Sequence, residues 1–384
     1  MLLSIIIVNY NVKFFLEQCL CSVRKALDFG AALNRQEASF GEVIVVDNHS
    51  TDGSIEYLKP RFPFVKFIGN KENRGFSRAN NQALSQASGK YILFLNPDTI
   101  LPEDVFQKTI SFLEANPDAG LLGIRMVDGS GNFLKESKRG MPTPWASFCK
   151  MSGLTALFPT SKLFARYYLG HLNERETLRA DVLAGAFMLA PANLLKEVGG
   201  FDEQFFMYAE DIDLSYRVSQ TGRSNYYFTG ATIIHFKGES TRKDAGYVKL
   251  FYKAMRQFVK KHYRSGSGLI FSGMLTTAIR LRSVASVIRG SAIMPKVLPI
   301  EDATLRGDEE TVKLLGQSLR KRNIEIKGNS SNIIYCEGKN YSFHHIIEAI
   351  QQMNSMENAL IHASGSNSIV GSGNKDHQGM AFEI

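Results

Sequence analysis

The chain contains little cysteine and no hydrophobic run long enough to span a membrane. Its four cysteines among 384 residues are Cys19, Cys21, Cys149 and Cys336. They match no zinc-site spacing, so we expect unpaired thiols in a reducing compartment. The apolar start from Met1 to Ile5 lacks the basic flank and the cleavage site of a signal peptide. No charge-free apolar stretch reaches the length of a membrane-spanning helix. These absences predict a cytoplasmic protein.

Basic residues outnumber acidic ones and give a formal net charge of +8, while a hydrophobic content of 44% is ordinary for a globular protein. The excess charge favours anionic partners: a nucleoside diphosphate, an acidic membrane surface or nucleic acid. No stacking motif or recognition helix accompanies the charge, so we expect no nucleic-acid partner. The length suggests two domains, or one large domain with an appendage.

Short β-branched runs alternate with segments of helical spacing along the first part of the chain. The expected strands are Ile5–Val8, Val43–Val46, Val65–Ile68 and Tyr91–Leu95. The expected helices are Phe14–Leu27, a short one through Ile55 and Leu58, Ser77–Ala87 and Glu103–Glu114. Residues 125–180 are less regular, and strands at Ala184–Ala190 and Ala231–Ile234 flank a helix at Asp211–Gln220. The alternation predicts an α/β fold with a mostly parallel, doubly wound sheet.

Polar clusters follow three of the expected strands: Asn9-Tyr10-Asn11, Asp47-Asn48 and Asn96-Pro97-Asp98. Because such sheets bind ligands where strands meet their following loops, we expect these clusters to converge on one edge. Asp98 could hold a divalent cation, with Asn96 offering a neutral oxygen, since Mg²⁺ and Mn²⁺ favour oxygen ligands completed by substrate phosphates. The alternative is that the third cluster is merely a turn.

Other clusters could also carry chemistry. Glu210-Asp211 could supply a general base, although adjacent acids at a helix start often only stabilise its dipole. Asp213 is spaced as an ordinary helical ion pair with Arg217, so we expect it to be structural. Asn73-Arg74-Gly75-Phe76 opens a helix with donors that suit an anion or a nucleobase edge, unless it is a plain loop. His235 ends a strand, where a lone histidine is more often structural than a ligand.

In this order, the segments resemble the family 2 glycosyltransferases, which are inverting enzymes with the GT-A fold. The resemblance runs from about Ser4 to His262. It rests on residues 4–11 (SIIIVNYN), 45–54 (VVDNHSTDGS), 73–76 (NRGF), 94–98 (FLNPD), 199–202 (GGFD) and 210–214 (EDIDL). It implies transfer of a sugar from a nucleoside-diphosphate donor to the hydroxyl of a saccharide or lipid-linked acceptor, in the synthesis of cell-surface polysaccharide or glycolipid. It also implies a divalent metal, Mg²⁺ or Mn²⁺, at the diphosphate.

The resemblance assigns donor-binding roles. Val8, through its backbone, and Tyr10 match positions at the nucleobase. Asp47 matches the acid that pairs with the base edge, and Arg74, with Asn73 before it, matches a base or phosphate contact.

The resemblance also assigns the metal and the base. Asp98 matches the final, metal-binding aspartate of the family's DXD motif, and His235 resembles the histidine that completes the metal site in some members. The chain departs from the motif at Asn96-Pro97, as in the rhamnosyl- and galactofuranosyl-type branch, which leaves the need for a metal open. Asp211 matches the general base. Inversion needs one displacement and one base, which agrees with the absence of a Ser/His/Asp arrangement.

We expect the catalytic domain to comprise residues 1–262. The chain beyond it falls into two parts. Residues 263–296 carry Arg264, Arg280, Arg282, Arg289 and Lys296 among apolar residues, with no acid. They predict a basic amphipathic helix on an anionic membrane surface, unless its apolar face packs on the protein. Residues 297–384 predict a small α/β segment with helices at Glu309–Leu319 and Phe343–Met353, strands at Ile333–Cys336 and Ala359–Ile361, and loops at Ser364–Gly373. It weakly resembles a Rossmann-like piece of bacterial polysaccharide enzymes, but lacks the G-x-G-x-x-G of a dinucleotide site.

Two other functions stay open. An inactive sugar- or nucleotide-binding scaffold would share the fold without the reaction. A nucleotidyltransferase would need a glycine-rich basic loop directly after the first strand, where this chain has Asn9-Tyr10-Asn11. Ser240 to Lys243 could form a lid over the diphosphate or a solvated loop.

Overall fold

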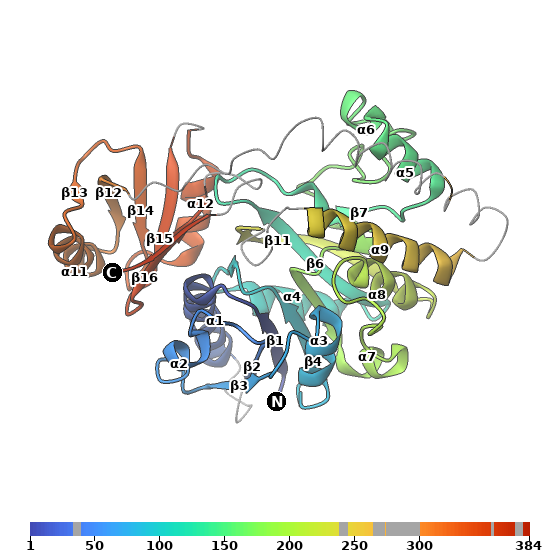
Figure 1. Cartoon of the computed structure of the whole chain (residues 1–384), viewed down its shortest axis with the longest axis horizontal. Coiled ribbons are helices and arrows are strands. Elements are labelled where there is room, and N and C mark those ends of the chain that lie inside the picture. The colour runs from blue at the N-terminus through green and yellow to red at the C-terminus, as the bar shows by residue number, and fades with distance from the viewer. Residues whose placement is uncertain (34–39, 238–244, 264–272, 274–299, 355–356, 373–378) are drawn as a thin grey trace.

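The fold is built on a mixed sheet, shown in Figure 1. The structure is a computed structural model that describes residues 1–33, 40–237, 245–263, 273, 300–354, 357–372 and 379–384. Within these residues the sheet has nine strands in the order β3-β2-β1-β4-β10-β6-β11-β5, with β8 paired to β11. The strands are β1 (Leu3–Asn9), β2 (Gly41–Asp47), β3 (Val65–Gly69), β4 (Tyr91–Leu95), β5 (Thr99–Ile100), β6 (Ala119–Val127), β8 (Leu178–Arg179), β10 (Phe187–Pro191) and β11 (Ser224–His235).

The sheet is parallel where the sequence predicted it and mixed beyond that point. β1 pairs in parallel with β2 and β4, and β2 with β3. β10 runs antiparallel between β4 and β6, while β11 is parallel to β6 and antiparallel to β5. The mostly parallel α/β fold is confirmed, with β10 as an inserted antiparallel strand.

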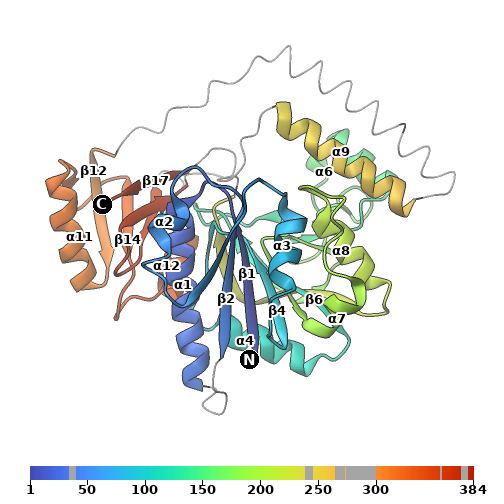
Figure 2. The ribbon, with the colours of Figure 1, turned by 60° about the horizontal axis from the view of Figure 1, so that its bottom comes forward.

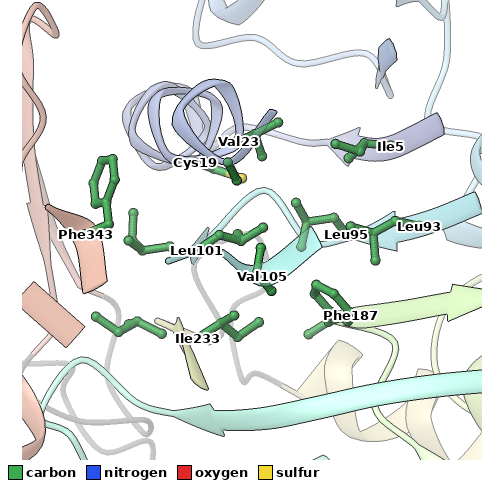
Figure 3. Packing of buried hydrophobic residues seen from close by; sticks show 14 of the residues in the cluster. Ile5, Cys19, Val23, Leu93, Leu95, Leu101, Val105, Phe187, Ile233 and Phe343 are labelled. Carbon is green, nitrogen blue, oxygen red and sulfur yellow. The ribbon is translucent and has the colours of Figure 1, made fainter. Parts of the chain in front are cut away.

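Helices cover both faces of this sheet and divide its apolar residues into two cores. The helices are α1 (Lys13–Leu33), α2 (Ser54–Leu58), α3 (Phe76–Leu84), α4 (Val105–Ala115), α7 (Ala192–Val198), α8 (Glu210–Ser219) and α9 (Ala245–His262). Because successive strand residues point to opposite faces, Ile5 and Ile7 pack with α1 and α4, whereas Ile6 and Val8 pack with α3, α7 and α8. Figure 3 shows the first core, with Cys19 and Val23 of α1 above Leu93 and Leu95.

A second sheet follows near the C-terminus, in the order β13-β12-β14-β15-β16-β17. Its elements are β12 (Asp302–Gly307), α11 (Glu309–Lys321), β13 (Glu325–Ile326), β14 (Asn332–Cys336), α12 (Phe343–Gln351), β15 (Asn358–His362), β16 (Ser368–Gly371) and β17 (Met380–Glu383). The four strands β13, β12, β14 and β15 pair in parallel, and the last two strands are antiparallel. The expected loop at Ser364–Gly373 was therefore wrong in part, because β16 lies within it.

The second sheet packs against α1 (Figure 2). The Gln18 amide on α1 donates to Ser366 Oγ at 2.8 Å and to the Ser368 carbonyl at 2.9 Å. Phe343 and Ile361 belong to the same buried cluster as the α1 residues of the first sheet. The two sheets thus share one continuous apolar core, with α1 between them.

The remaining elements form an irregular region between β6 and β10. It contains η1 (Lys135–Ser137), the strand pair β7 (Lys138–Arg139) and β9 (Val182–Leu183), and the helices α5 (Pro144–Met151) and α6 (Leu154–Leu157). The sequence did not predict β6 or α9. The four cysteines are free and buried, as expected.

The predicted basic segment at 263–296 lies outside the described residues, apart from Tyr263 and Gly273. Ser240 to Lys243 lie outside them as well. In the part of the chain that the structure describes, no helix is long and apolar enough to cross a membrane.

Candidate active site

The ends of β1 and β2 bring the first two polar clusters together. Asn9 and Asp47 lie opposite each other in the parallel register, and the Asn9 amide donates to Asp47 Oδ1 at 2.7 Å. The backbone N–H of Ser50 donates to Asp47 Oδ2 at 2.9 Å, so the buried carboxylate is held from both sides. Val8 is buried in β1, while Tyr10 keeps 36% of its surface exposed just beyond the strand. Asn9, Tyr10, Asp47 and Ser50 therefore form one end of a polar edge of the sheet.

Asn48 ties this edge to the loop before α3. Its amide donates to Asn73 Oδ1 at 2.9 Å, and its carbonyl oxygen accepts from the Arg74 backbone at 3.0 Å. Asn73 therefore shapes the loop through its side chain, and the Arg74 side chain is exposed beside it. Gly75 has φ +80, and a Cβ there would lie 2.6 Å from the Phe206 carbonyl oxygen. Glycine is thus required where this loop meets the chain that leads into α8.

Asn96, Asp98 and His235 converge at the next strand end. The pairing of β5 with β11 sets His235 opposite Thr99, and the Phe236 backbone donates to the Asp98 carbonyl at 3.0 Å. His235 Nε2 lies 3.3 Å from Asp98 Oδ1 and 3.3 Å from the Asn96 amide nitrogen. His235 Nδ1 is buried and has no hydrogen-bond partner among the described residues.

This cluster fits a divalent cation bound by two side chains. Two neighbouring ligand atoms that each lie about 2.1 Å from an octahedral ion are about 3 Å apart. The 3.3 Å between His235 Nε2 and Asp98 Oδ1 is close to this separation. Among the described residues no group of three or more His, Cys, Asp or Glu side chains is placed to hold a metal. A cation here would therefore complete its shell with substrate oxygens and water, as Mg²⁺ does in phosphate-binding sites.

Asp211 lies at the start of α8 and pairs with Arg139 of β7. Arg139 Nη2 donates to Asp211 Oδ2 at 2.5 Å and to the Leu183 carbonyl at 3.0 Å. The Gly185 backbone donates to the same Asp211 oxygen at 3.4 Å, and the Ala186 carbonyl accepts from the Asn96 backbone at 3.0 Å. The Gly185–Ala186 segment therefore links the candidate base to the candidate metal cluster. No sequence pattern pointed to Arg139, because its partner is 72 residues away.

Glu210 sits beside Asp211 but in a different environment. It is buried, and its Oε2 atom has no hydrogen-bond partner in the part of the chain that the structure describes. Burial, and then the charge of the Asp211 carboxylate, raise the pKa of Glu210 to about 8. Glu210 is thus mainly protonated at neutral pH.

Comparison with known proteins agrees with this geometry. The family model described as "Glycosyl transferase family 2" matches residues 4–173. The model described as "Glycosyl transferase family group 2" matches residues 91–290, and this second match alone covers more than half of the chain. The chain belongs to glycosyl transferase family 2. A curated relative is the N-acetylglucosaminyl-diphospho-decaprenol L-rhamnosyltransferase of Mycobacterium tuberculosis, 25% identical over 331 residues that cover 82% of this chain and 97% of the relative.

Other relatives of this family 2 glycosyltransferase match a smaller part of the chain or are less similar in sequence. The rhamnosyltransferase WbbL of Escherichia coli K12 is 29% identical over 50% of this chain and 69% of its own length. Among solved structures, the mannosyltransferase PcManGT from Pyrobaculum calidifontis, in complex with GDP-Man and Mn²⁺, has a TM-score of 0.48 at 17% identity, and 76% of each chain is covered. Staphylococcus aureus TarS 1–349 has a TM-score of 0.45 at 18% identity, covering 77% of this chain and 76% of that one.

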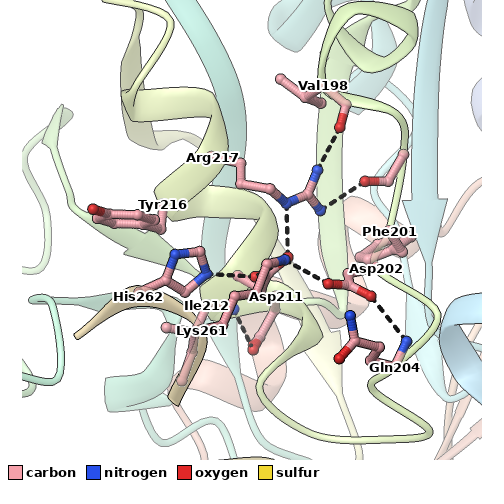
Figure 4. A network of polar contacts seen from close by, with 12 residues as sticks. Val198, Phe201, Asp202, Gln204, Asp211, Ile212, Tyr216, Arg217, Lys261 and His262 are labelled. Atoms are coloured by element: carbon pink, nitrogen blue, oxygen red, sulfur yellow. Dashed lines mark hydrogen bonds and ion pairs between the residues drawn. The ribbon is translucent and has the colours of Figure 1, made fainter. Parts of the chain in front are cut away.

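Asp213 of the glycosyltransferase has the structural place that its spacing to Arg217 predicted. It is fully buried and accepts from Arg217 Nε at 2.7 Å. Lys261 Nζ and His262 Nε2 of α9 both lie 2.7 Å from its other oxygen, and Lys261 also reaches Asp202 (Figure 4). This cluster fastens α9 to α8, the helix that carries Asp211.

Replacing Asp213 by asparagine should destabilise the glycosyltransferase by about 3 kcal/mol, at the lower end for a broken buried ion pair, because the partly buried Arg217 and Lys261 lose a counter-charge. Burial alone would raise the pKa of Asp213, but Lys261, Arg217 and His262 outweigh it and lower the pKa. Stabilisation by a carboxylate with a lowered pKa is complete above the ordinary aspartate value of about 3.9 and is lost as pH falls through the folded-state value. Denaturant unfolding at neutral pH and near pH 3 should therefore show the difference between wild type and Asp213→Asn shrinking in acid.

Asp118→Asn provides the matched control for this measurement. Asp118 pairs with Arg179 in an exposed salt bridge, with 46% of its side chain accessible, so its loss should cost less than about 1 kcal/mol. Equal losses for the two variants would contradict the structural role of the buried cluster.

Proposed function

We propose that this glycosyltransferase moves a sugar, of rhamnosyl type, from a nucleoside-diphosphate donor to a hydroxyl of a lipid-linked acceptor, with inversion and with a divalent cation. The observation that carries the proposal is the link between Asp211 and the Asp98–His235 cluster through Gly185 and Ala186. It would put a carboxylate base and a cation site on one short segment. The name of the mycobacterial relative, with its rhamnosyl donor and its diphospho-decaprenol acceptor, supports the choice of substrates.

The donor would lie along the polar edge from β1 to β4. Asp47 and Tyr10 would contact the nucleobase, with the Val8 backbone beneath it, and Arg74 would face the base or a phosphate. Asp98 and His235 would hold Mg²⁺ or Mn²⁺, which when bound neutralises the negative charge that develops on the leaving diphosphate. Asn96 supports this arrangement because its amide contacts His235 and its backbone is bonded to Ala186.

Asp211 would be the general base, and Glu210 would not. A base must be ionised before it accepts the proton of the acceptor hydroxyl. The raised pKa of Glu210 keeps that carboxyl group mainly protonated at neutral pH, because it is buried next to another acid. Asp211 keeps 16% of its side chain exposed, and Arg139 fixes one of its oxygens. This contrast supports Asp211, the acid that the family resemblance matched to the general base.

Arg139 would position the base. Arg139 is anchored by the Leu183 carbonyl and donates to Asp211 Oδ2. The other carboxylate oxygen, Asp211 Oδ1, accepts a hydrogen bond from the Ile212 backbone at 2.8 Å. The carboxylate is therefore oriented before an acceptor arrives, which lowers the entropic cost of reaching the reactive geometry.

The proposal is tested by screening nucleoside-diphosphate sugars, rhamnosyl donors among them, with and without a lipid-linked N-acetylglucosaminyl diphosphate acceptor. We expect release of nucleoside diphosphate that requires both the acceptor and a divalent cation, and a product of inverted anomeric configuration by NMR. Tight donor binding without turnover on any acceptor would instead favour the inactive scaffold.

A further inference from the structure

Exposed apolar side chains of the glycosyltransferase are concentrated in the region of α5 and α6. Among the described residues, twelve large apolar side chains are exposed, and five of these belong to this short region. They are Trp145, Phe148, Leu157, Phe158 and Leu163, with exposed fractions of 42%, 39%, 71%, 50% and 55%. We refer to these five residues as the α5–α6 patch. Scattered apolar residues need no explanation on a protein surface, but such a cluster points to a partner.

Several polar groups around the patch make hydrogen bonds within the protein. Thr143 caps α5 by accepting from the Ala146 backbone. Trp145 Nε1 donates to the Leu163 carbonyl at 3.0 Å, and Thr155 Oγ1 donates to the Phe164 carbonyl at 2.7 Å. The indole therefore needs no hydrogen bond from solvent. A surface of this kind can leave water without losing hydrogen bonds.

The sequence around the patch is mainly basic, and the exposed Asp181 is an acid that contacts the Met141 backbone just before α5. No acidic residue occurs from residue 137 to residue 173, and Lys162 and Arg166 are exposed among the apolar side chains. α9 has no acidic residue either. Its exposed basic residues recur at intervals of four, three and four, which places them on one helix face: Lys249, Lys253, Arg256 and Lys260. We call these four residues the α9 stripe.

The patch and the stripe belong to adjoining elements. Met151 of α5 packs against the buried cluster that contains Met255 and Phe258 of α9. Figure 1 shows α5, α6 and α9 together, on the side of the molecule away from the second sheet, and Figure 2 shows α6 and α9 on that side too. Aromatic and aliphatic side chains beside a mainly basic surface are the features of an interfacial membrane site.

We infer that the α5–α6 patch and the α9 stripe dock the glycosyltransferase on an anionic lipid bilayer. The patch would enter the headgroup region, and the stripe would lie against acidic headgroups. A protein partner is disfavoured, because lysine is depleted at protein–protein interfaces and three of the four residues of the α9 stripe are lysines. The inference is separate from the predicted segment at 263–296, which lies outside the described residues. If the proposed function holds, a lipid-linked acceptor would reach the base from this side of the molecule. Arg139, which pairs with Asp211, lies a few residues before α5.

Trp145 provides a direct test, because it is the only tryptophan of the chain. Its fluorescence would be recorded for the full chain with vesicles of phosphatidylglycerol and phosphatidylcholine, and with vesicles of phosphatidylcholine alone. We expect a blue shift with the anionic vesicles, quenching when their lipids carry bromine on the acyl chains, and reversal at high salt. No sugar transfer enters this measurement, so its failure would leave the proposed reaction untouched.

Two sets of variants locate the contact. The first is a triple variant of the α9 stripe, Lys253→Gln with Arg256→Gln and Lys260→Gln. It should weaken vesicle binding roughly a hundredfold, since each basic side chain near anionic lipid contributes about a factor of five in affinity. Leu157→Gln with Phe158→Gln and Leu163→Gln should remove the blue shift. The matched control is Lys313→Gln with Leu314→Gln and Arg320→Gln on α11, whose side chains are equally exposed. This control should bind vesicles like wild type, and circular dichroism should show all three variants folded.

Three results would overturn the inference. The first is absence of vesicle binding at low salt. The second is binding that leaves Trp145 emission unchanged and is lost only when Arg280, Arg282 and Arg289 become glutamine, because the contact would then lie in the 263–296 segment. The third is a Trp145 that is already shielded from acrylamide without vesicles, which would mean that the chain itself covers the patch.

Discussion

Asp211→Asn should abolish sugar transfer while donor binding stays close to that of wild type. The asparagine keeps the shape of the side chain, and its oxygen can still accept from Arg139, but it cannot take the proton of the attacking hydroxyl. Loss of a general base lowers rates by roughly 10²–10⁴. The donor would be unaffected because the Asp211 carboxylate is bonded to Arg139, Gly185 and Ile212, away from the Asp47 end of the site. Turnover would be measured by nucleoside-diphosphate release and donor affinity by calorimetry.

Asp118→Asn is the control for this variant, because it makes the same chemical change on an exposed side chain before β6. It should retain wild-type turnover. A turnover of Asp211→Asn within a few-fold of wild type would remove Asp211 from the role of base. A parallel loss of donor affinity would show instead that the substitution had disturbed the whole site.

Asp98→Ala should weaken binding of the nucleoside diphosphate in the presence of Mg²⁺ or Mn²⁺, and should lower transfer by on the order of 10²–10³. The estimate follows from the several kcal/mol that a cation contributes to charge stabilisation at a phosphoryl oxygen, at about 1.4 kcal/mol per factor of ten. A chelator should produce the same loss in wild type, since both changes act on one interaction. Calorimetric titration of the nucleoside diphosphate with and without metal measures the binding directly.

The two losses should not add. If Asp98 acts through the cation, a chelator should have little further effect on Asp98→Ala, whereas Asp118→Ala should remain fully sensitive to it. Full activity of wild type in excess chelator would mean that the diphosphate is neutralised by protein cations such as Arg74 and that Asp98 serves another purpose.

The sequence predicted the parts of the site that follow strands, because a strand end is a local feature. The β-branched runs located β1, β2 and β4, and parallel pairing then had to bring Asn9, Asp47 and Asn96 to one edge. Local patterns named His235 and Asp98 only as separate candidates, and the family resemblance assigned both to one metal site. Their 3.3 Å approach depends on the short antiparallel pair of β5 and β11, which no local pattern reveals.

The parts that the sequence could not predict depend on contacts between distant segments. Arg139 has no periodic or motif signal, and its meaning comes from a partner 72 residues away. The Asp213–Arg217 pair follows helical spacing and was predicted, but Lys261 and His262 join it from a helix that was not. Local pattern alone did not separate Glu210 from Asp211, the family resemblance pointed to Asp211 as the base, and the burial of Glu210 adds a physical difference between them.

The shared packing of the two sheets on α1 bears on how this protein would melt. Gln18 is buried between the sheets, and Phe343 and Ile361 complete the same apolar cluster as the strands of the first sheet. Detaching the second sheet would expose that cluster to water and break the hydrogen bonds of Gln18 to Ser366 and Ser368, so neither part is a free-standing unit. The described sheets should therefore unfold in one cooperative transition, with a calorimetric enthalpy equal to the van't Hoff enthalpy. Two resolved transitions would mean that α1 holds the second sheet as a separable attachment.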